Sequence, residues 1–308
     1  MKKIFIDGSA GTTGLRIAER LESRKDIELI KLSEENRKDI AARKEAINLA
    51  DIAFLCLPDA AAIEAVSLIE NDNTVVLDTS TAHRTNEDWA YGFPELSKEH
   101  EEKIKNSKRI AVPGCHASGF IALIYPLVEK EILDKNALLS CFSLTGYSGG
   151  GKKMIAEYEA SDKDNLLNAA RQYGLSQNHK HLPEMKAITG IKNEPVFIPV
   201  VDNFYSGMEV TVPLFASEIN GTVEDIKKAY KEKYQGPLVN YVEDFDEQGF
   251  VSANKLSFKD SMEISVSGNK DRILLIARYD NLGKGASGAA VECMNIVLGV
   301  SKTEGLDI

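Results

Sequence analysis

The 308-residue chain has little of what disulfide-rich, metal-rich or membrane-spanning proteins need. It contains four cysteines at the irregular positions 56, 115, 141 and 293, and only five histidines. This spacing favours neither a disulfide framework nor a metal site, so we expect a cytoplasmic protein without a bound metal. The longest apolar stretch, around Phe120 to Val128, is far too short to cross a bilayer and contains Pro126.

Positive charge is also in short supply. The chain has 37 Lys and Arg against 47 Asp and Glu, a formal net charge of −10. This balance argues against non-specific binding to nucleic acid or to an anionic membrane surface. We therefore expect a small-molecule partner, and an anionic one must be bound by Lys, Arg and backbone N–H groups placed locally.

The order of apolar segments predicts two domains. In the first third, buried strands such as Lys3 to Ile6 and Ile52 to Leu57 alternate with helical segments such as Leu15 to Glu22. This pattern indicates an α/β, Rossmann-type doubly wound parallel sheet in residues 1–115. Longer alternating strands follow in residues 116–285, which predicts an α+β domain with a mixed or antiparallel sheet. The last helix, about 286–300, is expected to pack back on the first domain.

The first turn of the chain has the composition of a dinucleotide-binding loop. It follows the first strand, precedes the first helix and has the spacing G-x-x-G-x-x-G; its candidate binding residues are Gly8, Ser9, Gly11, Thr12, Thr13 and Gly14. Glycines there allow the backbone to approach a pyrophosphate, which then lies at the helix N-terminus. The alternative is a tight turn without a ligand.

The end of the second strand bears on the choice between NAD and NADP. Ser33 and Arg37 stand where an NAD site usually has an acidic residue, and they would suit a 2′-phosphate. Glu34 and Glu35 count against this interpretation. We predict NADP(H), with a solvated run of charges as the alternative.

Cys115 is the candidate nucleophile. It lies where the strand Arg109 to Val112 turns through Pro113 and Gly114 into the apolar, helical segment Phe120 to Val128. Free amide groups at a helix start favour the thiolate. A buried structural thiol is the alternative.

A cysteine nucleophile needs a proton acceptor, and the segment His179-Lys180-His181 offers two. An H-x-H pair can also bind a metal, but no third histidine cluster supports that reading. His116 points away from the cysteine if its segment is helical, so we expect it only to support the site.

Two further glycine-rich segments precede helices. The segment from Gly146 to Lys153 matches G-x-x-x-x-G-K, but a P-loop needs Ser or Thr where Lys153 stands. We expect a flexible loop whose Lys152 and Lys153 bind a phosphate or carboxylate. Near the C-terminus, Asn281 and Lys284 lie in a small-residue stretch against which a cofactor ring could pack, and Asn281 could hydrogen-bond a carboxamide.

Taken in order, these motifs resemble a known family. The segments are Gly8–Gly14, Asp78–Arg84, Tyr91–Glu95, Pro113–Cys115, Gly146–Lys153, His179–Glu184 and Lys284–Ala286. They are similar to those of the N-acetyl-γ-glutamyl-phosphate reductases of short type, NADPH enzymes of arginine biosynthesis in the semialdehyde dehydrogenase superfamily. The chain departs from the commoner pattern at Ala82-His83-Arg84, where longer members carry an acidic and an aromatic residue before the arginine.

The resemblance implies a reaction and roles. Cys115 would form a thioester with an acyl phosphate, and NADPH would reduce it to the aldehyde. His181 would manage the proton, with His179 as its alternate, and Arg84, Lys152 and Lys153 would bind the substrate's phosphate and carboxylate. Residues 1–115 would form the NADP-binding domain and residues 116–285 the catalytic and oligomerisation domain, and a homo-oligomer, dimer or tetramer, is expected. The alternatives are aspartate-semialdehyde dehydrogenase, which shares fold and cysteine chemistry, and a non-catalytic NADPH-sensing protein.

Overall fold

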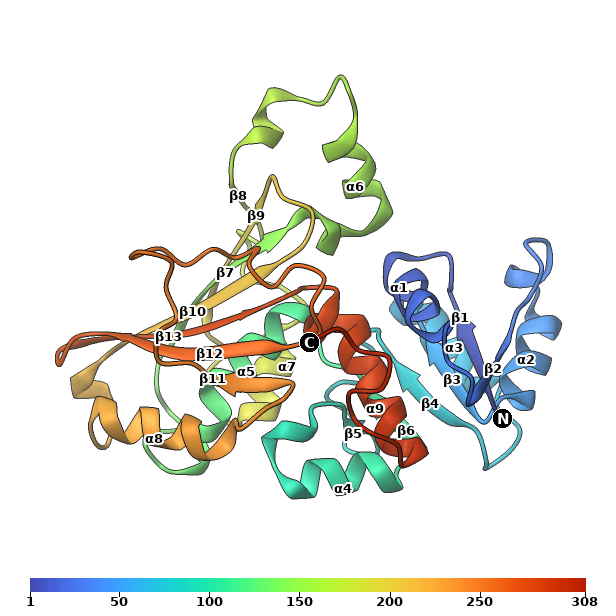
Figure 1. Cartoon of the computed structure of the whole chain (residues 1–308), viewed down its shortest axis with the longest axis horizontal. Helices are drawn as coiled ribbons and strands as arrows, with labels where there is room; N and C mark the ends of the chain where they lie inside the picture. Colours follow the sequence, from blue (N-terminus) through green and yellow to red (C-terminus); the bar gives the residue numbers. More distant parts are fainter. The chain divides into compact units, whose positions relative to one another are not determined.

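The computed structural model describes all 308 residues and divides into two compact units (Figure 1). Unit 1 comprises residues 1–114 and 286–306, and unit 2 comprises residues 115–285 and 307–308. No helix is long and apolar enough to cross a membrane.

Unit 1 is built on a six-stranded sheet in the order β2-β1-β3-β4-β6-β5, in which every pair is parallel. Its strands are β1 (Lys2–Asp7), β2 (Ile27–Ile30), β3 (Ile52–Leu55), β4 (Val75–Asp78), β5 (Ala90–Tyr91) and β6 (Arg109–Ala111). Its helices are α1 (Thr12–Leu21), α2 (Ile40–Leu49), α3 (Asp59–Ser67), α4 (Lys98–Asn106) and α9 (Gly288–Leu298), with short 3₁₀ turns η1 (Asn36–Lys38) and η2 (Pro94–Leu96). The predicted doubly wound parallel sheet is confirmed.

Helices cover both faces of this sheet, and successive side chains of each strand, which point to opposite faces, are therefore buried on both sides. On β1, Ile4 and Ile6 belong to one core cluster and Phe5 to the other. The first cluster includes residues of α1, α4 and α9, and the second includes residues of α2 and α3. This arrangement explains why the strands are apolar throughout.

Unit 2 contains a seven-stranded mixed sheet in the order β11-β12-β13-β10-β7-β9-β8. Its strands are β7 (Ser140–Gly146), β8 (Arg171–Gln172), β9 (Val196–Asp202), β10 (Met208–Phe215), β11 (Val239–Tyr241), β12 (Met262–Gly268) and β13 (Arg272–Tyr279). Its helices are α5 (Cys115–Glu129), α6 (Gly151–Glu159), α7 (Leu182–Thr189) and α8 (Val223–Lys233), with 3₁₀ turns η3 (Tyr147–Gly150), η4 (Asn165–Asn168) and η5 (Ala216–Glu218); a π-helical turn, η6 (Gly283–Ser287), leads into α9. β7 pairs with β9, and β11 with β12, in parallel, while the other pairs are antiparallel.

Helix α5 is the buried centre of unit 2, and twelve of its residues are buried, as expected for a helix that is apolar all round. Pro126 lies inside it and has no N–H, so the carbonyl of Ala122 loses its partner four residues on. The hydroxyl of Tyr234 donates to that carbonyl at 2.7 Å, and the hydroxyl of Tyr230 donates to the carbonyl of Leu123 at 2.6 Å. Helix α8 and the residue that follows it thus satisfy the backbone that the proline disturbs.

The helix predicted over residues 120–128 in fact begins at Cys115. β6 ends at Ala111, and the three residues Val112 to Gly114 suffice to turn the chain. The predicted start lies too far along the chain because the small residues at positions 117–119 carry no strong helical pattern. As a result, Cys115 belongs to the first turn of the helix.

Candidate active site

Cys115 is the first residue of α5, at the helix end where backbone N–H groups have no intrahelical partners. The hydroxyl of Tyr279, the last residue of β13, lies within this first turn. It accepts a hydrogen bond from the N–H of Gly119 at 3.0 Å and donates to the carbonyl of Cys115 at 2.5 Å. In an uninterrupted helix these two backbone groups would bond to each other. Tyr279 therefore holds the turn that carries Cys115, the predicted nucleophile.

The tyrosine bridge depends on the absence of a side chain at Gly119. A Cβ atom there would lie 2.7 Å from the hydroxyl oxygen of Tyr279 and 2.7 Å from Cγ2 of Val210. Burial, and secondly the charge of Cys115, raise the pKa of Tyr279 well above its usual value. The hydroxyl therefore keeps its proton and remains a donor to the carbonyl of Cys115.

We expect the Tyr279→Phe variant to lower kcat roughly 10- to 100-fold with little change in KM, because a small displacement of the nucleophile is enough to cost this much. The measurement is steady-state kinetics per folded enzyme. Tyr230→Phe is the matched control, since it removes a tyrosine bond to the carbonyl of Leu123 later in the same helix. A Tyr279→Phe enzyme with wild-type kcat would contradict the role of the bridge.

Three histidines, His116, His179 and His181, form a cluster in unit 2, which we call the histidine cluster. The ring centroids of His116 and His179 are 5.7 Å apart, those of His116 and His181 5.6 Å, and those of His179 and His181 4.8 Å. Phe197 of β9 packs against His116 and His179, at 5.3 and 5.0 Å. The sequence led us to expect His116 only to support the site, and the structure packs its ring against both histidines of the H-x-H motif.

The H-x-H segment is held by its own backbone. The N–H of Leu182 donates to the carbonyl of His179 at 3.0 Å, and the N–H of His181 approaches Nδ1 of His179 at 3.3 Å. His181 then serves as the N-cap residue of α7, and its carbonyl accepts from Met185 at 2.9 Å. The His181 side chain is buried, so α7 fixes this imidazole inside the unit.

Two rings of the histidine cluster, those of His116 and His179, are uncharged at physiological pH. Burial, and secondly the charge of His179, lower the pKa of His116 to about 3. Burial, and secondly the charge of Lys180, lower the pKa of His179 below its usual value. A neutral imidazole can accept a proton, so the cluster can supply a general base. No group of three or more His, Cys, Asp or Glu side chains is arranged to hold a metal ion.

Unit 1 contains the predicted dinucleotide-binding loop, residues 8–14. Gly8 has φ +83°, and a Cβ there would lie 2.3 Å from the carbonyl oxygen of Cys56. A Cβ at Gly14 would lie 2.5 Å from the carbonyl oxygen of Gly8, so both positions require glycine. Gly11 is the N-cap of α1 and offers no side-chain cap.

The loop fits a phosphate group. Helix α1 has no acidic residue in its first turn, and its N-terminal N–H groups receive no side-chain acceptor from Gly11. The hydroxyl of Thr12 is buried without a hydrogen-bond partner. A buried unpartnered hydroxyl beside unsatisfied N–H groups is what a bound pyrophosphate would complete.

The residues predicted to select the cofactor lie beyond β2. The carbonyl of Ser33 accepts from the N–H groups of Asn36 and Arg37, at 3.1 and 3.0 Å. The Arg37 guanidinium lies 3.2 Å from Glu34, and both side chains are largely exposed. Such a surface ion pair is weak and can rearrange around a ligand.

The predicted substrate-binding cations differ in their surroundings. Arg84 is buried in unit 1, and its guanidinium donates to the carbonyls of Val112 and Thr79, both at 2.8 Å. Lys152 and Lys153 are exposed in the first turn of α6. The flexible loop predicted around them is wrong, because η3 and α6 order the segment, and the N–H of Tyr147 donates to the carbonyl of Phe204.

The two C-terminal candidates are buried in unit 2. Nδ2 of Asn281 donates to the hydroxyl of Ser148 at 3.0 Å, and its Oδ1 accepts from the N–H of Gly207 at 2.9 Å. Lys284 is 2% exposed. Asn281 therefore joins the turn after β7 to the turn before β10, and its predicted contact with a carboxamide would use its second amide hydrogen.

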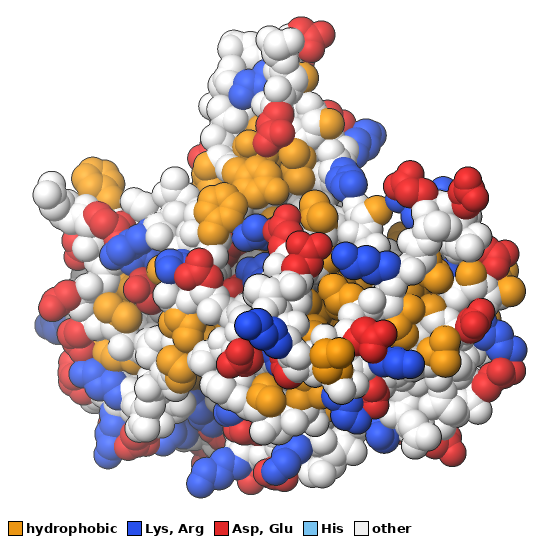
Figure 2. Space-filling model, turned by 45° about the vertical axis from the view of Figure 1, so that its right-hand side comes forward, with side chains coloured by type: hydrophobic (Ala, Val, Ile, Leu, Met, Phe, Trp, Pro, Cys, Tyr) orange, Lys and Arg blue, Asp and Glu red, His pale blue; other side chains and the backbone are white.

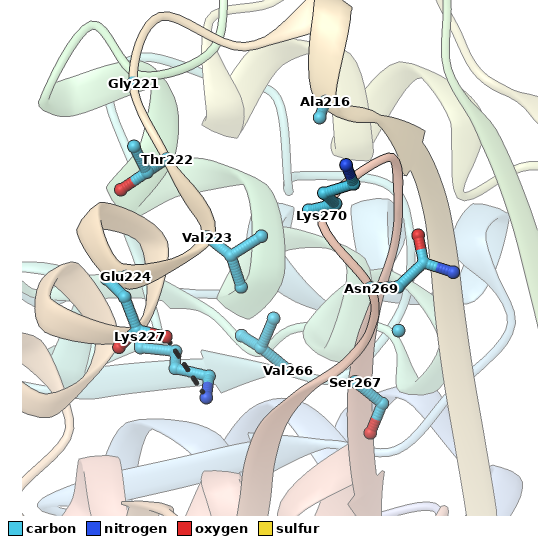
Figure 3. A pocket seen from close by; sticks show the side chains of 11 residues that line it. Ala216, Gly221, Thr222, Val223, Glu224, Lys227, Val266, Ser267, Asn269 and Lys270 are labelled. Carbon is cyan, nitrogen blue, oxygen red and sulfur yellow. Dashed lines mark ion pairs between the residues drawn. The ribbon is translucent and has the colours of Figure 1, made fainter.

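A separate cavity of about 500 Å³ lies at the far end of β12 and β13 (Figure 3). It is lined by Ala216, by the start of α8 and by the turn between the two strands. Lys227 in its wall pairs with Glu243 at 2.8 Å and with Glu224 at 3.5 Å. None of the predicted site residues lines this cavity. On the molecular face in Figure 2, cationic and anionic side chains are interspersed, so positive charge for a ligand must be local.

Comparisons with known proteins place the chain in a class. Residues 3–104 match the model of the semialdehyde dehydrogenase NAD-binding domain, and residues 115–281 match that of the semialdehyde dehydrogenase dimerisation domain. Solved structures agree on the fold. Aspartate semialdehyde dehydrogenase II of Vibrio cholerae has a TM-score of 0.71 at 15% identity, with 97% of this chain and 98% of that one covered. The enzyme of Candida albicans, solved with NADP, has a TM-score of 0.64 at 15% identity over 97% and 98%.

Curated relatives are more specific. The N-acetyl-gamma-glutamyl-phosphate reductases of Brucella ovis and Chelativorans sp. are 44% and 45% identical to the chain, covering 96% of it and 99% and 98% of themselves. That of Rhizobium meliloti is 43% identical, with 96% and 98% covered. The chain therefore belongs to the N-acetyl-gamma-glutamyl-phosphate reductase family, an oxidoreductase family with an NAD(P)-binding domain. The resemblance seen in the sequence motifs is confirmed.

Sequence reasoning missed the residues that hold the turn of Cys115 and the ring of His116 from distant parts of the chain. Tyr279 and Ser143 lie on strands, and Tyr173 follows the short strand β8. Only the position of Tyr279, two residues before the candidate Asn281, offered a signal. Ser143 could have been noticed as a polar residue on the inward side of β7, where its neighbours Cys141 and Thr145 are also buried.

Proposed function

We propose that the chain reduces N-acetyl-glutamyl 5-phosphate to the 5-semialdehyde, with Cys115 as the nucleophile. The observation that carries the proposal is the position of Cys115 at an N-terminal helix turn whose next residue packs into the histidine cluster. The names of the curated relatives support the choice of substrate. Their identity to the chain favours it over aspartate semialdehyde, since the aspartate semialdehyde dehydrogenases among the solved structures support the fold alone.

The chemistry begins with proton transfer from the Cys115 thiol to a neutral imidazole. The thiolate attacks the carbonyl carbon of the acyl phosphate, and the bond from that carbon to the phosphate oxygen breaks, so phosphate leaves with the electron pair. A thioester remains on Cys115. The positive potential at the start of α5 is proposed to stabilise the oxyanion that forms during attack.

A nicotinamide cofactor, when bound, supplies the hydride that reduces the thioester. The C–S bond then breaks, the aldehyde leaves and the sulfur of Cys115 departs as thiolate. The imidazolium returns its proton to that sulfur, and Cys115 is ready for another turnover. We assign the proton transfer to His181, with His179 as the alternate, because His181 is the more deeply buried and is fixed at the start of α7.

Several basic residues are proposed to bind the anionic substrate. Lys152 and Lys153 stand exposed at the N-terminus of α6, where helix N–H groups add positive potential. Arg84, buried in unit 1, is proposed to bind phosphate or carboxylate through the edge of its guanidinium. These groups would supply locally the positive charge that the chain as a whole lacks.

The cofactor is proposed to be NADP(H), held by the loop of residues 8–14 with Ser33 and Arg37 on the 2′-phosphate. Asn281 and Lys284 are proposed to contact the nicotinamide end. The exposed Arg37 supports this choice, as does the absence of an acidic residue at the end of β2. We further propose that unit 1 is the cofactor-binding domain and unit 2 the catalytic domain.

We propose that the enzyme self-associates through the open face of the unit 2 sheet. Helices α5, α7 and α8 pack in unit 2, and α5 and α8 lie against β10, β12 and β13. Apolar residues remain exposed along the other side of these strands: Phe215 is 59% and Leu274 39% exposed. Sedimentation equilibrium should therefore give a mass of at least twice 33.8 kDa, the mass of the chain. A monomer at micromolar concentration would contradict the proposal.

The reverse reaction tests both substrate and cofactor. We expect phosphate-dependent reduction of NADP⁺ with N-acetyl-glutamate 5-semialdehyde, and a lower KM for NADP⁺ than for NAD⁺. Aspartate semialdehyde is the matched control substrate, which keeps the aldehyde but is shorter and lacks the acetyl group. Activity on aspartate semialdehyde alone would refute the proposed substrate, and a lower KM for NAD⁺ would refute the cofactor preference. Binding of NADPH without turnover would indicate a sensing protein.

A further inference from the structure

The proposed chemistry gives no task to His116, although the histidine cluster is built around it. We propose that His116 is a positioning residue, which fixes the rings of His179 and His181 so that one of them can exchange a proton with Cys115. The inference rests on the acid/base role proposed above for that pair.

Both nitrogens of His116 are anchored. Nδ1 lies 2.6 Å from the hydroxyl of Ser143, and Nε2 lies 2.7 Å from the hydroxyl of Tyr173. A neutral imidazole has one donor and one acceptor nitrogen, and a hydroxyl can play either part, so both contacts are satisfied in either tautomer. Turning the ring over would replace both nitrogens by carbons and lose both bonds. The ring is therefore confined to one orientation.

The anchors are themselves fixed. Ser143 is fully buried in β7, where it is paired with Pro199 on one side and Val210 on the other. The N–H of Tyr173 donates to the carbonyl of Pro199 at 3.0 Å. Both anchor residues are thus held by the unit 2 sheet, Ser143 within β7 and Tyr173 by β9, and this limits the movement of the His116 ring.

The ring of His116 constrains the rings of His179 and His181 through direct contact. The ring of His179 meets that of His116 edge to face, at an interplanar angle of 83°, and the ring of His181 meets it at 52°. Phe197 closes the other side of His116 and His179. Because close-packed rings cannot move independently, a displaced His116 would displace both candidate bases.

His116 does this without competing for the proton. Its pKa, which burial lowers to about 3, keeps it neutral while the neighbouring bases titrate. The titratable groups near the cluster are Cys115 on the same helix, Tyr173, His179, Lys180 and His181, with the buried Glu184 on α7. A charged ring at position 116 would oppose a proton on His179, and a neutral one does not.

The test removes one anchor at a time, with Ser143→Ala and Tyr173→Phe. We expect kcat per folded enzyme to fall about 10-fold in each variant, with KM changed less than about twofold. If His179 is the base, we also expect the acid limb of the kcat/KM profile to move to higher pH. Looser packing exposes His179 to water, and its pKa, which burial now lowers, rises towards the usual value. Ser143→Thr restores the hydroxyl and should recover most of the lost kcat.

Matched controls separate positioning from general loss of packing. Ser265→Ala removes a buried hydroxyl on β12 that has no hydrogen-bond partner, and Tyr158→Phe does the same for a buried tyrosine. Both should keep the wild-type kcat and pH profile. If the anchor variants lower only the melting temperature and leave kcat and the acid limb unchanged, His116 is merely structural and the inference is wrong.

Variants of the two candidate bases distinguish a failure of the positioning role of His116 from a failure of the proposed acid/base chemistry. If His179→Asn and His181→Asn both retain wild-type kcat, the acid/base proposal itself fails. Should the anchor variants not fold, ¹⁵N-histidine NMR of the wild-type enzyme decides the matter. The His116 ring should keep its neutral pattern from pH 8 to pH 5 while another ring of the cluster titrates. A His116 that titrates near pH 6.5 would overturn the inference.

Discussion

Replacing Cys115 by serine is expected to abolish reduction of the acyl phosphate, lowering kcat by roughly 10³-fold or more. A serine hydroxyl has nearly the same size but is far less acidic than a thiol, so it gives up its proton much less readily and is the weaker nucleophile at neutral pH. The measurement is phosphate-dependent reduction of NADP⁺ by the semialdehyde. NADPH affinity, followed by fluorescence titration, should stay within about twofold of wild type, since the loop of residues 8–14 lies in unit 1.

The matched control for this variant is Cys293→Ser. The Cys293 thiol is fully buried and lies 3.4 Å from the carbonyl oxygen of Gly92, to which a serine hydroxyl can also donate. It should retain kcat, and mass spectrometry of the wild-type enzyme mixed with acyl phosphate should find the acyl group on Cys115. Substantial turnover by Cys115→Ser would sink the covalent mechanism. Loss of NADPH binding in the same variant would instead reveal a folding defect.

Replacing His181, the proposed acid/base residue, is expected to have the next largest effect. His181→Asn should lower kcat/KM by ~10²–10⁴-fold, the usual contribution of a positioned general base. The rate at which iodoacetamide alkylates Cys115 at pH 7 should fall with it, because fewer thiols would lose their proton. His100→Asn is the control: His100 lies on α4 of unit 1, where its Nδ1 is 2.9 Å from the hydroxyl of Ser97.

The pH profile distinguishes the two histidines of the motif. A base must be neutral to act, so kcat/KM falls as the pH drops through its pKa. Burial lowers the pKa of His179, so an acid limb set by His179 should lie below about pH 6.5. If His179→Asn causes the larger loss and also abolishes that limb, the two roles are exchanged. If neither variant changes activity or alkylation, the histidine cluster has no catalytic part.

The parts of the fold that could be predicted are those encoded locally. The buried strands of unit 1 are apolar on both faces, and glycine is required at Gly8 and Gly14 by the backbone around them. Cys115 could be recognised because a strand, a Pro-Gly turn and an apolar segment adjoin it in sequence. Such signals depend on neighbouring residues, so no knowledge of the tertiary structure was needed.

The support of the site could not be predicted in this way. The parallel pairing of β7 with β9 depends on the crossover connection between them, and the sequence of neither strand predicts this pairing. Ser143 becomes a partner of His116 only because the sheet brings this residue of β7 to the first turn of α5. Tyr279, which contacts the first turn of that helix, lies at the end of β13, 160 positions further along the chain than Gly119. Contacts of this kind depend on registers that a single sequence does not reveal.

The Tyr279 bridge has a consequence for how the enzyme acquires its reactivity. The bond from Gly119 to Tyr279 joins residues 160 positions apart, and those from His116 to Ser143 and Tyr173 close loops of 27 and 57 residues. Contacts that close such long loops form late in folding, because the chain loses the entropy of the loop before the stabilising contacts are made. A partly synthesised or partly folded chain therefore carries an ordinary thiol at position 115. The environment that we propose makes Cys115 a nucleophile is completed only when β13, among the last strands to leave the ribosome, takes its place in the sheet.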